Sequence, residues 1–361
     1  MFMLLGVQIA VAQQTPKYSN EFLAIGVGAR GMAMSNSQVS IVDDATAGYW
    51  NPAGLLNIKE KYSVSAMHAS YFAGIANYDY VGFATPVDKR SHIGVTLIRF
   101  AVDDIPDTRF LFDANGSLNY DNIRSFSAAD YAFMFSYARR SLLVKGLKLG
   151  ANFKVIHRSV GIFANAWGFG IDIGAQLDRK NWHFGLAARD VTGTYNTWNY
   201  NPDTFYEIFS QTGNTIPNNS VEVTLPRILG GVAYSVRIKN KFGALLAAEF
   251  DMTLDGKRNT VLKTDAFSLD PHVGLELDYQ QLVYLRGGVG QFQEIKNFDG
   301  TTYMTFQPNF GVGIRLKNFV IDYALTDIGD SSEALYSHVF SIKLGMGKSK
   351  FTKPRFEYEQ E

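Results

Sequence analysis

Residues along most of the chain alternate between apolar side chains and small or polar ones, and this period of two constrains the fold most. In residues 147–155, Leu, Leu, Ala, Phe and Val alternate with Lys, Gly, Asn and Lys. Because successive side chains of a strand point to opposite faces, each such run has one apolar face and one polar face. We predict strands at 61–71, 78–87, 91–101, 129–139, 145–157, 165–178, 182–190, 225–238, 241–252, 270–279, 282–291, 304–316, 318–327 and 336–346.

The connections between these runs alternate strictly between short and long. Short ones include 88–90 and 239–240, whereas 102–128, 191–224 and 253–269 are long. An up-and-down barrel with tight turns at one end and long loops at the other produces this pattern, and a soluble sandwich has no reason to. The prediction is therefore an all-β fold: a fourteen-stranded antiparallel transmembrane β-barrel of the outer membrane.

Charge follows the same division between the two ends. The short turns are basic, as at Lys89, Arg90 and Lys239, and the long loops are acidic, as at Asp103 and Asp104. Lys and Arg (34) balance Asp and Glu (34), so the chain has no net field to attract nucleic acid. Ordinary solvated loops are the alternative explanation for any single charge.

The composition argues against a catalytic or metal site. Cysteine is absent, which removes disulfides, thiolate nucleophiles and cysteine metal ligands. The six histidines show no ligand spacing, and no G-x-S-x-G motif occurs. Residues 26–31 match G-x-G-x-x-G literally, but a dinucleotide site needs that turn in a parallel βαβ unit. We expect no enzyme activity and no cofactor.

The chain divides into four segments. Residues 1–12 are a short apolar run ending in Ala-Val-Ala and are predicted to be a signal peptide, although a buried first strand is an alternative. Residues 13–60 form the N-terminal segment with the hatch, 61–346 the barrel, and 347–361 a charged periplasmic tail.

The segment 26–55 is predicted to be a small hatch inside the lumen. It is too small and too polar for a lipid-facing strand, and Pro52 cannot donate to a ladder. We expect Asp43 and Asp44 to accept backbone N–H bonds within the hatch or to pair with lumen cations such as Lys148, Arg286 or Arg315. Asn51 can hold a turn through its side chain. The hatch motif comprises Gly28, Arg30, Gly31, Asp43, Asp44, Ala45, Asn51, Pro52, Ala53 and Gly54.

The long connection 191–224 is rich in aromatic residues. At this density in an exposed loop they favour a partner-binding surface, and a loop folded back onto the barrel mouth is the alternative. The candidate partner-binding residues are Tyr195, Trp198, Tyr200, Phe205, Tyr206 and Phe209.

Three motifs carry a resemblance to a known family: 28–34 (GARGMAM), 43–45 (DDA) and 51–55 (NPAGL). On these the chain resembles FadL-like outer-membrane proteins, and more closely the PorV/PorQ family of Bacteroidetes. That branch also has segments that are similar to 93–97 (IGVTL) and 104–108 (DIPDT).

The resemblance implies a fourteen-stranded barrel with an N-terminal hatch and a role in type IX secretion. Its partners would be translocon or attachment-complex proteins and secreted cargo, with outer-membrane lipid around the barrel and no nucleic acid. The alternative is a FadL-like channel for uptake of hydrophobic small molecules. Such a channel needs an apolar pocket beside the hatch, whereas a secretion component needs outward loops that grip a protein.

Overall fold

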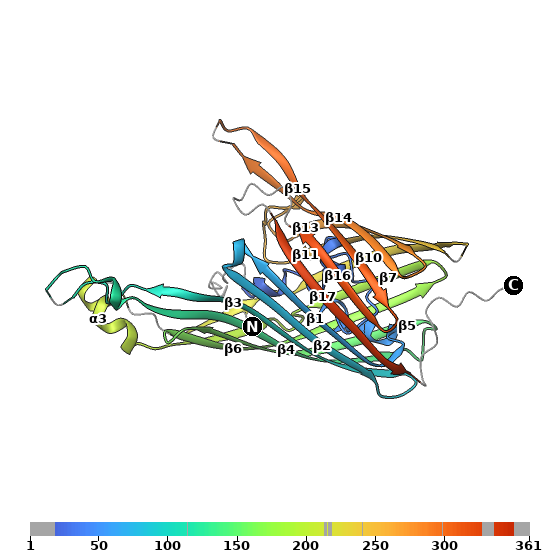
Figure 1. Cartoon of the computed structure of the whole chain (residues 1–361), viewed down its shortest axis with the longest axis horizontal. Helices are drawn as coiled ribbons and strands as arrows, with labels where there is room; N and C mark the ends of the chain where they lie inside the picture. The colour runs from blue at the N-terminus through green and yellow to red at the C-terminus, as the bar shows by residue number, and fades with distance from the viewer. Residues whose placement is uncertain are drawn as a thin grey trace, which may run out of the picture.

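Strand β17 pairs with β1, so the sheet closes on itself and forms a barrel (Figure 1). The computed structural model describes residues 19–113, 115–212, 215, 219–239, 241–297, 299–326 and 336–349. The predicted signal peptide at 1–12 lies outside the described residues, as does most of the predicted tail, of which 347–349 are described.

Every strand pairing is antiparallel. The strands are β1 (Glu60–Tyr71), β2 (Ala76–Pro86), β3 (Ser91–Asp107), β4 (Arg124–Arg140), β5 (Leu147–Val160), β6 (Ala164–Arg179), β7 (Trp182–Arg189), β8 (Thr194–Tyr200), β9 (Ser220–Thr224), β10 (Arg227–Ile238), β11 (Phe242–Thr253), β12 (Leu262–Lys263), β13 (Ser268–Tyr279), β14 (Val283–Lys296), β15 (Thr302–Leu316), β16 (Phe319–Thr326) and β17 (Ser337–Lys348). The helices are α1 (Ala29–Ala33), α2 (Ala47–Trp50), α3 (Asp203–Thr212) and the short 3-10 turns η1 (Glu21–Leu23), η2 (Pro52–Asn57), η3 (Phe72–Gly74) and η4 (Tyr120–Asn122).

The barrel wall consists of fourteen strand positions, as predicted. Three short strands do not add positions of their own. Residues 173–179 of β6 pair with β7, and residues 164–169 of β6 pair with β8. β8 therefore continues the wall position of β7 beyond a break. In the same way β9 precedes β10, and β12 is a two-residue addition beside β13. The fold-class prediction is confirmed.

The interval 191–224 differs from its prediction as a long loop. It contains β8, α3 and β9, and β8 and β9 pair with each other to lengthen the wall. The prediction was wrong because 194–200 (TYNTWNY) has its aromatic residues at 195, 198 and 200 and so lacks the period of two used to find strands.

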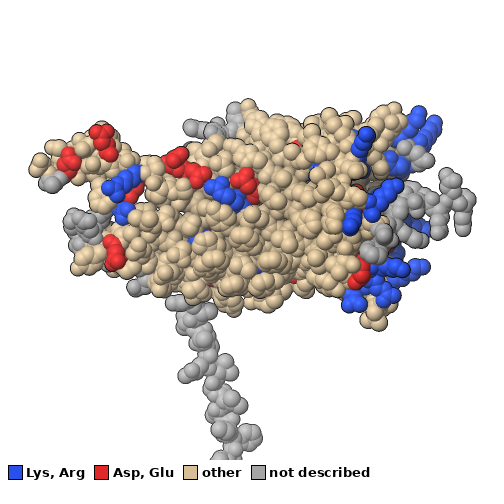
Figure 2. All heavy atoms as spheres, turned by 60° about the horizontal axis from the view of Figure 1, so that its bottom comes forward, with Lys and Arg blue, Asp and Glu red and all other residues tan. Residues whose placement is uncertain are grey.

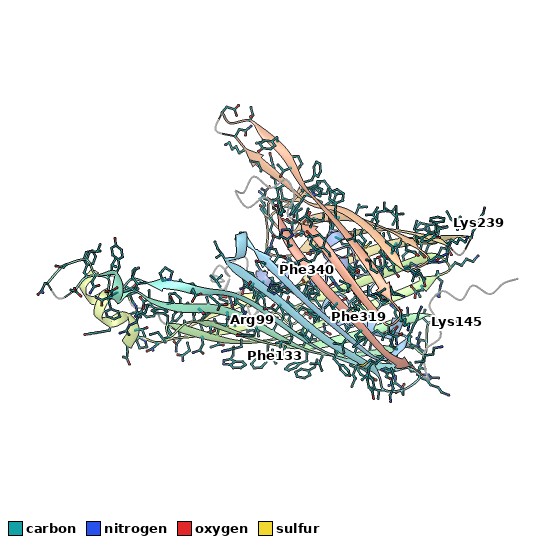
Figure 3. The ribbon with its side chains drawn as sticks, viewed as in Figure 1. Arg99, Phe133, Lys145, Lys239, Phe319 and Phe340 are labelled. Carbon is teal, nitrogen blue, oxygen red and sulfur yellow. The ribbon has the colours of Figure 1, made fainter. Side chains whose placement is uncertain are left out.

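The outer face of the wall is apolar over its middle. Phe133 is 38% exposed and Phe340 is 55% exposed, and the intervening residues of both strands point inward and are mostly buried (Figure 3). A barrel in water would bury such a face, whereas lipid solvates it. No helix in the described part of the chain is long and apolar enough to cross a bilayer.

The two ends of the barrel carry opposite charge. Figure 2 shows Lys and Arg side chains gathered at one end, and the Asp and Glu side chains of this view lie mainly toward the other. The basic end holds the short turns, among them the one at Gln280 and Gln281, whose φ angles of 54° and 55° match a type I′ hairpin. The charge sorting read from the sequence is thus a property of the folded molecule.

Candidate functional site: the hatch and the wall beside it

Residues 19–58 lie inside the barrel and are almost entirely buried, as predicted for the hatch. The segment turns sharply where glycine permits it, since Gly26 has φ of 110° and Gly28 has φ of 78°. Gly54 serves close packing instead, because a Cβ there would lie 2.8 Å from the carbonyl oxygen of Val42.

Glycines of the wall give the hatch backbone room to approach. A Cβ added at Gly288 on β14 would lie 2.5 Å from the carbonyl carbon of Met34 and 2.6 Å from the amide nitrogen of Ser35. A Cβ at Gly274 on β13 would lie 2.7 Å from the carbonyl oxygen of Met34. The lumen face therefore carries glycine where the hatch touches it.

Asn51 holds the turn that ends α2, as predicted. Its side-chain oxygen accepts a bond from the amide of Ala53 at 3.1 Å, and its side-chain nitrogen donates to the carbonyls of Val39 at 2.8 Å and Ala175 at 3.0 Å. Asn51 thus joins two parts of the hatch to strand β6 of the wall.

A chain of ion pairs ties the hatch to strands β13, β14 and β16. Arg30 of α1 lies 2.9 Å from Asp43 and 2.8 Å from Glu276. Glu276 also pairs with Arg286 at 2.6 Å, and Arg286 pairs with Asp322 at 2.7 Å. Because the side chains of Glu276, Arg286 and Asp322 are at most 10% exposed, removing one of these three would leave an unpaired charge in a poorly solvated place.

Asp44 pairs with Lys343 of β17, with 2.5 Å between the carboxylate and the ammonium group. It also accepts a bond from the backbone amide of Thr46 at 2.8 Å, as predicted. Burial alone would raise the pKa of Asp44, but the attraction and hydrogen bond of Lys343 hold it at about 2.

The predicted cation partners of the two hatch aspartates were wrong. Asp43 pairs with Arg30 of the hatch itself, and Asp44 with Lys343. Lys148, one of the expected partners, instead bonds Asn57 and Asp178. The cause is the closure of the barrel, which brings the last strand to the part of the lumen where Asp44 lies.

The opposite wall holds the hatch through Arg189, near which Lys154 pairs with carboxylates of the wall itself. Lys154 pairs with Asp172 at 2.8 Å and with Asp190 at 2.6 Å. Arg189 donates to the carbonyl of Tyr49 at 3.1 Å and lies 4.5 Å from the centre of its ring.

A cavity of about 710 Å³ lies beside the hatch at a break in the wall. It is bounded by the start of the hatch at 19–24, by the β9–β10 junction at 223–227 and by residues 253–258 after β11. Next to the cavity, β9 pairs with β8 and with no other described strand, so one edge of β9 has no neighbouring strand in the wall. The sequence analysis missed the break, although Pro226, which cannot donate to a ladder, marks it.

The lining of this cavity mixes apolar and charged groups. Leu23, Tyr49 and Leu225 contribute apolar surface, and Lys154 and Arg189 lie at its inner side. The cavity is therefore less apolar than the pocket expected of a channel for hydrophobic compounds.

Glu21 lines the cavity and contacts arginines on both of its sides. Its carboxylate lies 2.9 Å from Arg258 and 3.7 Å from Arg227, which belong to the two sides of the wall break. The start of the hatch is thus fastened across the opening.

A second, smaller cavity of about 200 Å³ lies on the short-turn side of the hatch. Arg30, Asp44 and Lys343 line it, together with Arg237 and Arg315. Arg30, Asp43 and Asp44, the ion-paired residues of the hatch, therefore lie between this smaller cavity and the larger one. No group of three or more His, Asp or Glu residues within the described ranges is arranged to hold a metal ion.

The six aromatic residues proposed for partner binding fall on two elements. Tyr195, Trp198 and Tyr200 belong to β8, and Phe205, Tyr206 and Phe209 to α3. Trp198 is buried and Phe205 packs on Phe163 and Phe209, with ring centres 5.7 and 5.2 Å apart. Tyr195 (54% exposed) and Tyr206 (66% exposed) face solvent or lipid. Trp198 and Phe205 therefore pack against other residues, and Tyr195 and Tyr206 are the exposed members of the set.

Solved structures provide the one comparison that yields matches, since no protein-family model and no curated protein matches the sequence. The CymD monoaromatic hydrocarbon channel has 12% identity and a TM-score of 0.54, with 90% of this chain and 98% of that chain covered. The Pseudomonas putida toluene transporter TodX has 12% identity and a TM-score of 0.55, with 88% and 96% covered. The chain shares their fold. At this identity the likeness concerns the barrel architecture alone and leaves substrate and partners open.

Proposed function

We propose that this chain is an outer-membrane channel that takes up small, largely apolar molecules bearing a polar group. The cavity at the wall break carries the proposal, because it lies beside the hatch where β9 has β8 as its one neighbour among the described strands. Ligand pockets commonly combine apolar walls with a few polar groups that fix orientation, and this lining has both. The fold shared with hydrocarbon channels supports the same reading.

Filling the cavity tests whether it is the route. Ala24 lines the cavity, so Ala24→Trp should occupy its space and slow uptake. A ligand that needs the volume occupied by the indole should be taken up at least about tenfold more slowly, which corresponds to a penalty of about 1.4 kcal/mol. The measurement is uptake of radiolabelled toluene and benzyl alcohol by cells lacking other hydrocarbon channels.

Leu246→Trp is the matched control, because Leu246 lies on the outer face of β11 and is 53% exposed. It should leave uptake unchanged. Uptake by wild-type cells that is no faster than that of cells without the protein would contradict the proposed channel.

Locking the hatch tests whether the lumen is part of the route. A Cβ at Gly290 of β14 would lie 3.5 Å from the Cβ of Ser35, within the range for a disulfide, and the protein has no other cysteine. The same Cβ would lie 2.9 Å from the Cβ of His272, which must shift, so the reduced double variant is the reference for uptake. Oxidised Ser35→Cys/Gly290→Cys protein should stop uptake, and reduction should restore it. Uptake that persists in the oxidised protein would exclude hatch movement.

A component of type IX secretion is the second candidate function, and its sequence basis is the opening motifs at 28–34, 43–45 and 51–55 followed by the segments 93–97 and 104–108. The observation that favours it is the extension built by β8, α3 and β9, on which Tyr206 is exposed (Figure 1). Exposed aromatic side chains on a projecting element are typical of protein contact surfaces.

Affinity purification tests this second candidate. Partners captured in mild detergent by the wild type should be lost by Tyr206→Ser and kept by Tyr120→Ser, since Tyr120 is 69% exposed on a different connection. Identical partners for all three proteins would count against α3 as the contact.

A further inference from the structure

One arc of the short-turn end carries a continuous row of cations, here called the basic rim. Its members belong to neighbouring wall strands and turns from β17 through β6. Figure 2 shows Lys and Arg side chains gathered at this end of the barrel. The basic rim consists of Lys348, Lys89, Arg90, Arg139, Lys145 and Arg179.

Members of the basic rim continue the lipid-facing register of their strands. Arg139 follows Tyr137, which is 46% exposed on the outer face of β4. Arg179 likewise follows Leu177 of β6, and Lys348 follows Met346 of β17, which is 40% exposed. These cations therefore lie where the apolar belt ends, which is the depth of lipid headgroups.

Carboxylates also lie at this end: Glu60 is the cross-strand neighbour of Lys348, and Asp88 belongs to the same turn as Lys89 and Arg90. Asp88 accepts bonds from the backbone amides of Arg90 at 2.6 Å and Ser91 at 2.9 Å, and Asp178 bonds Lys148 and His183. Within the described part of the chain, no member of the basic rim forms an ion pair with a carboxylate. The six cations of the rim outnumber the nearby carboxylates Glu60, Asp88 and Asp178, so this arc carries an excess of positive charge.

An apolar turn lies in the middle of the basic rim. The β4–β5 turn exposes Leu142 (69%), Leu143 (96%) and Val144 (44%), with Arg139 and Lys145 on either side. Water is a poor solvent for such a turn, and the boundary between acyl chains and headgroups is a good one. Lysine and arginine beside interfacial apolar residues also snorkel toward headgroup phosphates.

We propose that the basic rim is a binding surface for anionic phospholipid headgroups, with the 142–144 turn inserted at the interface beside them. Both observations point to the same partner: the cations lie at headgroup depth, and the apolar turn lies where lipid begins. A lysine or arginine near an anionic surface contributes about a fivefold gain in binding, so several in one arc give marked preference for anionic lipid.

The test compares two triple variants with the same loss of charge. Arg90→Gln/Arg139→Gln/Lys145→Gln removes half of the basic rim. The control, Arg124→Gln/Lys263→Gln/Lys296→Gln, removes three exposed cations from the long-loop end. Native mass spectrometry counts the lipids retained by each protein from nanodiscs of equal phosphatidylglycerol and phosphatidylcholine, after heat-modified gel migration has shown that each barrel is folded.

The wild type and the control should retain phosphatidylglycerol in excess, and the rim variant should lose that excess by about fivefold or more. Added salt should reduce the preference of the wild type, because exposed charges are screened. Leu142→Ser/Leu143→Ser should lower retention of both lipids. Equal retention of the two lipids by the wild type, or equal loss in rim and control variants, would overturn the proposal.

Discussion

At the scale of single residues, buried charges rather than a continuous apolar core fasten one side of the hatch. Arg30 and Asp44 reach the wall through Glu276 and Lys343. Breaking a buried pair by removing one partner costs about 3–5 kcal/mol, whereas the intact pair adds little net stability. Such contacts fix the position of the hatch and can be released by a change in protonation.

Acid should loosen the hatch through Asp44. Its pKa of about 2 in the folded protein is below the ordinary value of 3.8, so its contribution is present above about pH 4. That contribution is lost as pH falls toward 2, and conductance in planar bilayers should rise over this window. Asp44→Asn should conduct more already at neutral pH, and Asp121→Asn, changed in an exposed turn, should behave as the wild type.

The sequence predicts which residues face the lumen better than it predicts which of them pair with one another. The inward register of Lys154 and Asp172 follows from the strand period, and Asn51 beside Pro52 indicates a turn. The pairing of Asp44 with Lys343 depends on which strands become neighbours when the barrel closes, and no local pattern contains that information. The break beside Pro226 was missed because residues 220–224 were assigned to a loop. They form β9, which precedes β10 at the same position of the wall.

At the scale of elements, strand and hatch fit because the lumen face carries glycine at the contact. On β14, Gly288 faces the hatch, while the neighbouring Gly287 faces outward, and the nearest atom to a Cβ there would be 3.8 Å away. Consecutive positions of β14 therefore differ: Gly288 has no room for a side chain, and Gly287 has room for one.

Gly288→Ala should displace the hatch, because the new Cβ would lie 2.5 Å from the backbone of Met34. Overpacking of this kind costs about 1–3 kcal/mol. We expect a higher basal conductance and a lower temperature for loss of heat-modified gel migration. Gly287→Ala on the same strand should match the wild type, and equal effects of both variants would show that the hatch does not rest on this face.

At the scale of the whole molecule, the barrel has two different ends. The short-turn end carries Lys145 and Lys239, and the other end carries the extended hairpins of β3–β4 and β14–β15 (Figure 3). Short turns face the periplasm in barrels of the outer membrane, so the long connections should face outward.

Labelling of intact cells tests this orientation. The chain contains no cysteine, so a single introduced cysteine reports its own position. A membrane-impermeant maleimide should label Lys296→Cys on intact cells and Lys145→Cys after lysis. Labelling of Lys145→Cys on intact cells would reverse the assigned orientation.

The central claim is that a closed barrel is kept shut by residues 26–55. Single-channel conductance of a protein lacking those residues tests it most directly, because fourteen paired wall strands should still close without the hatch. The account predicts a folded, heat-modifiable barrel with a large, steady conductance where the wild type shows little. A deletion protein that folds and conducts no more than the wild type would contradict it.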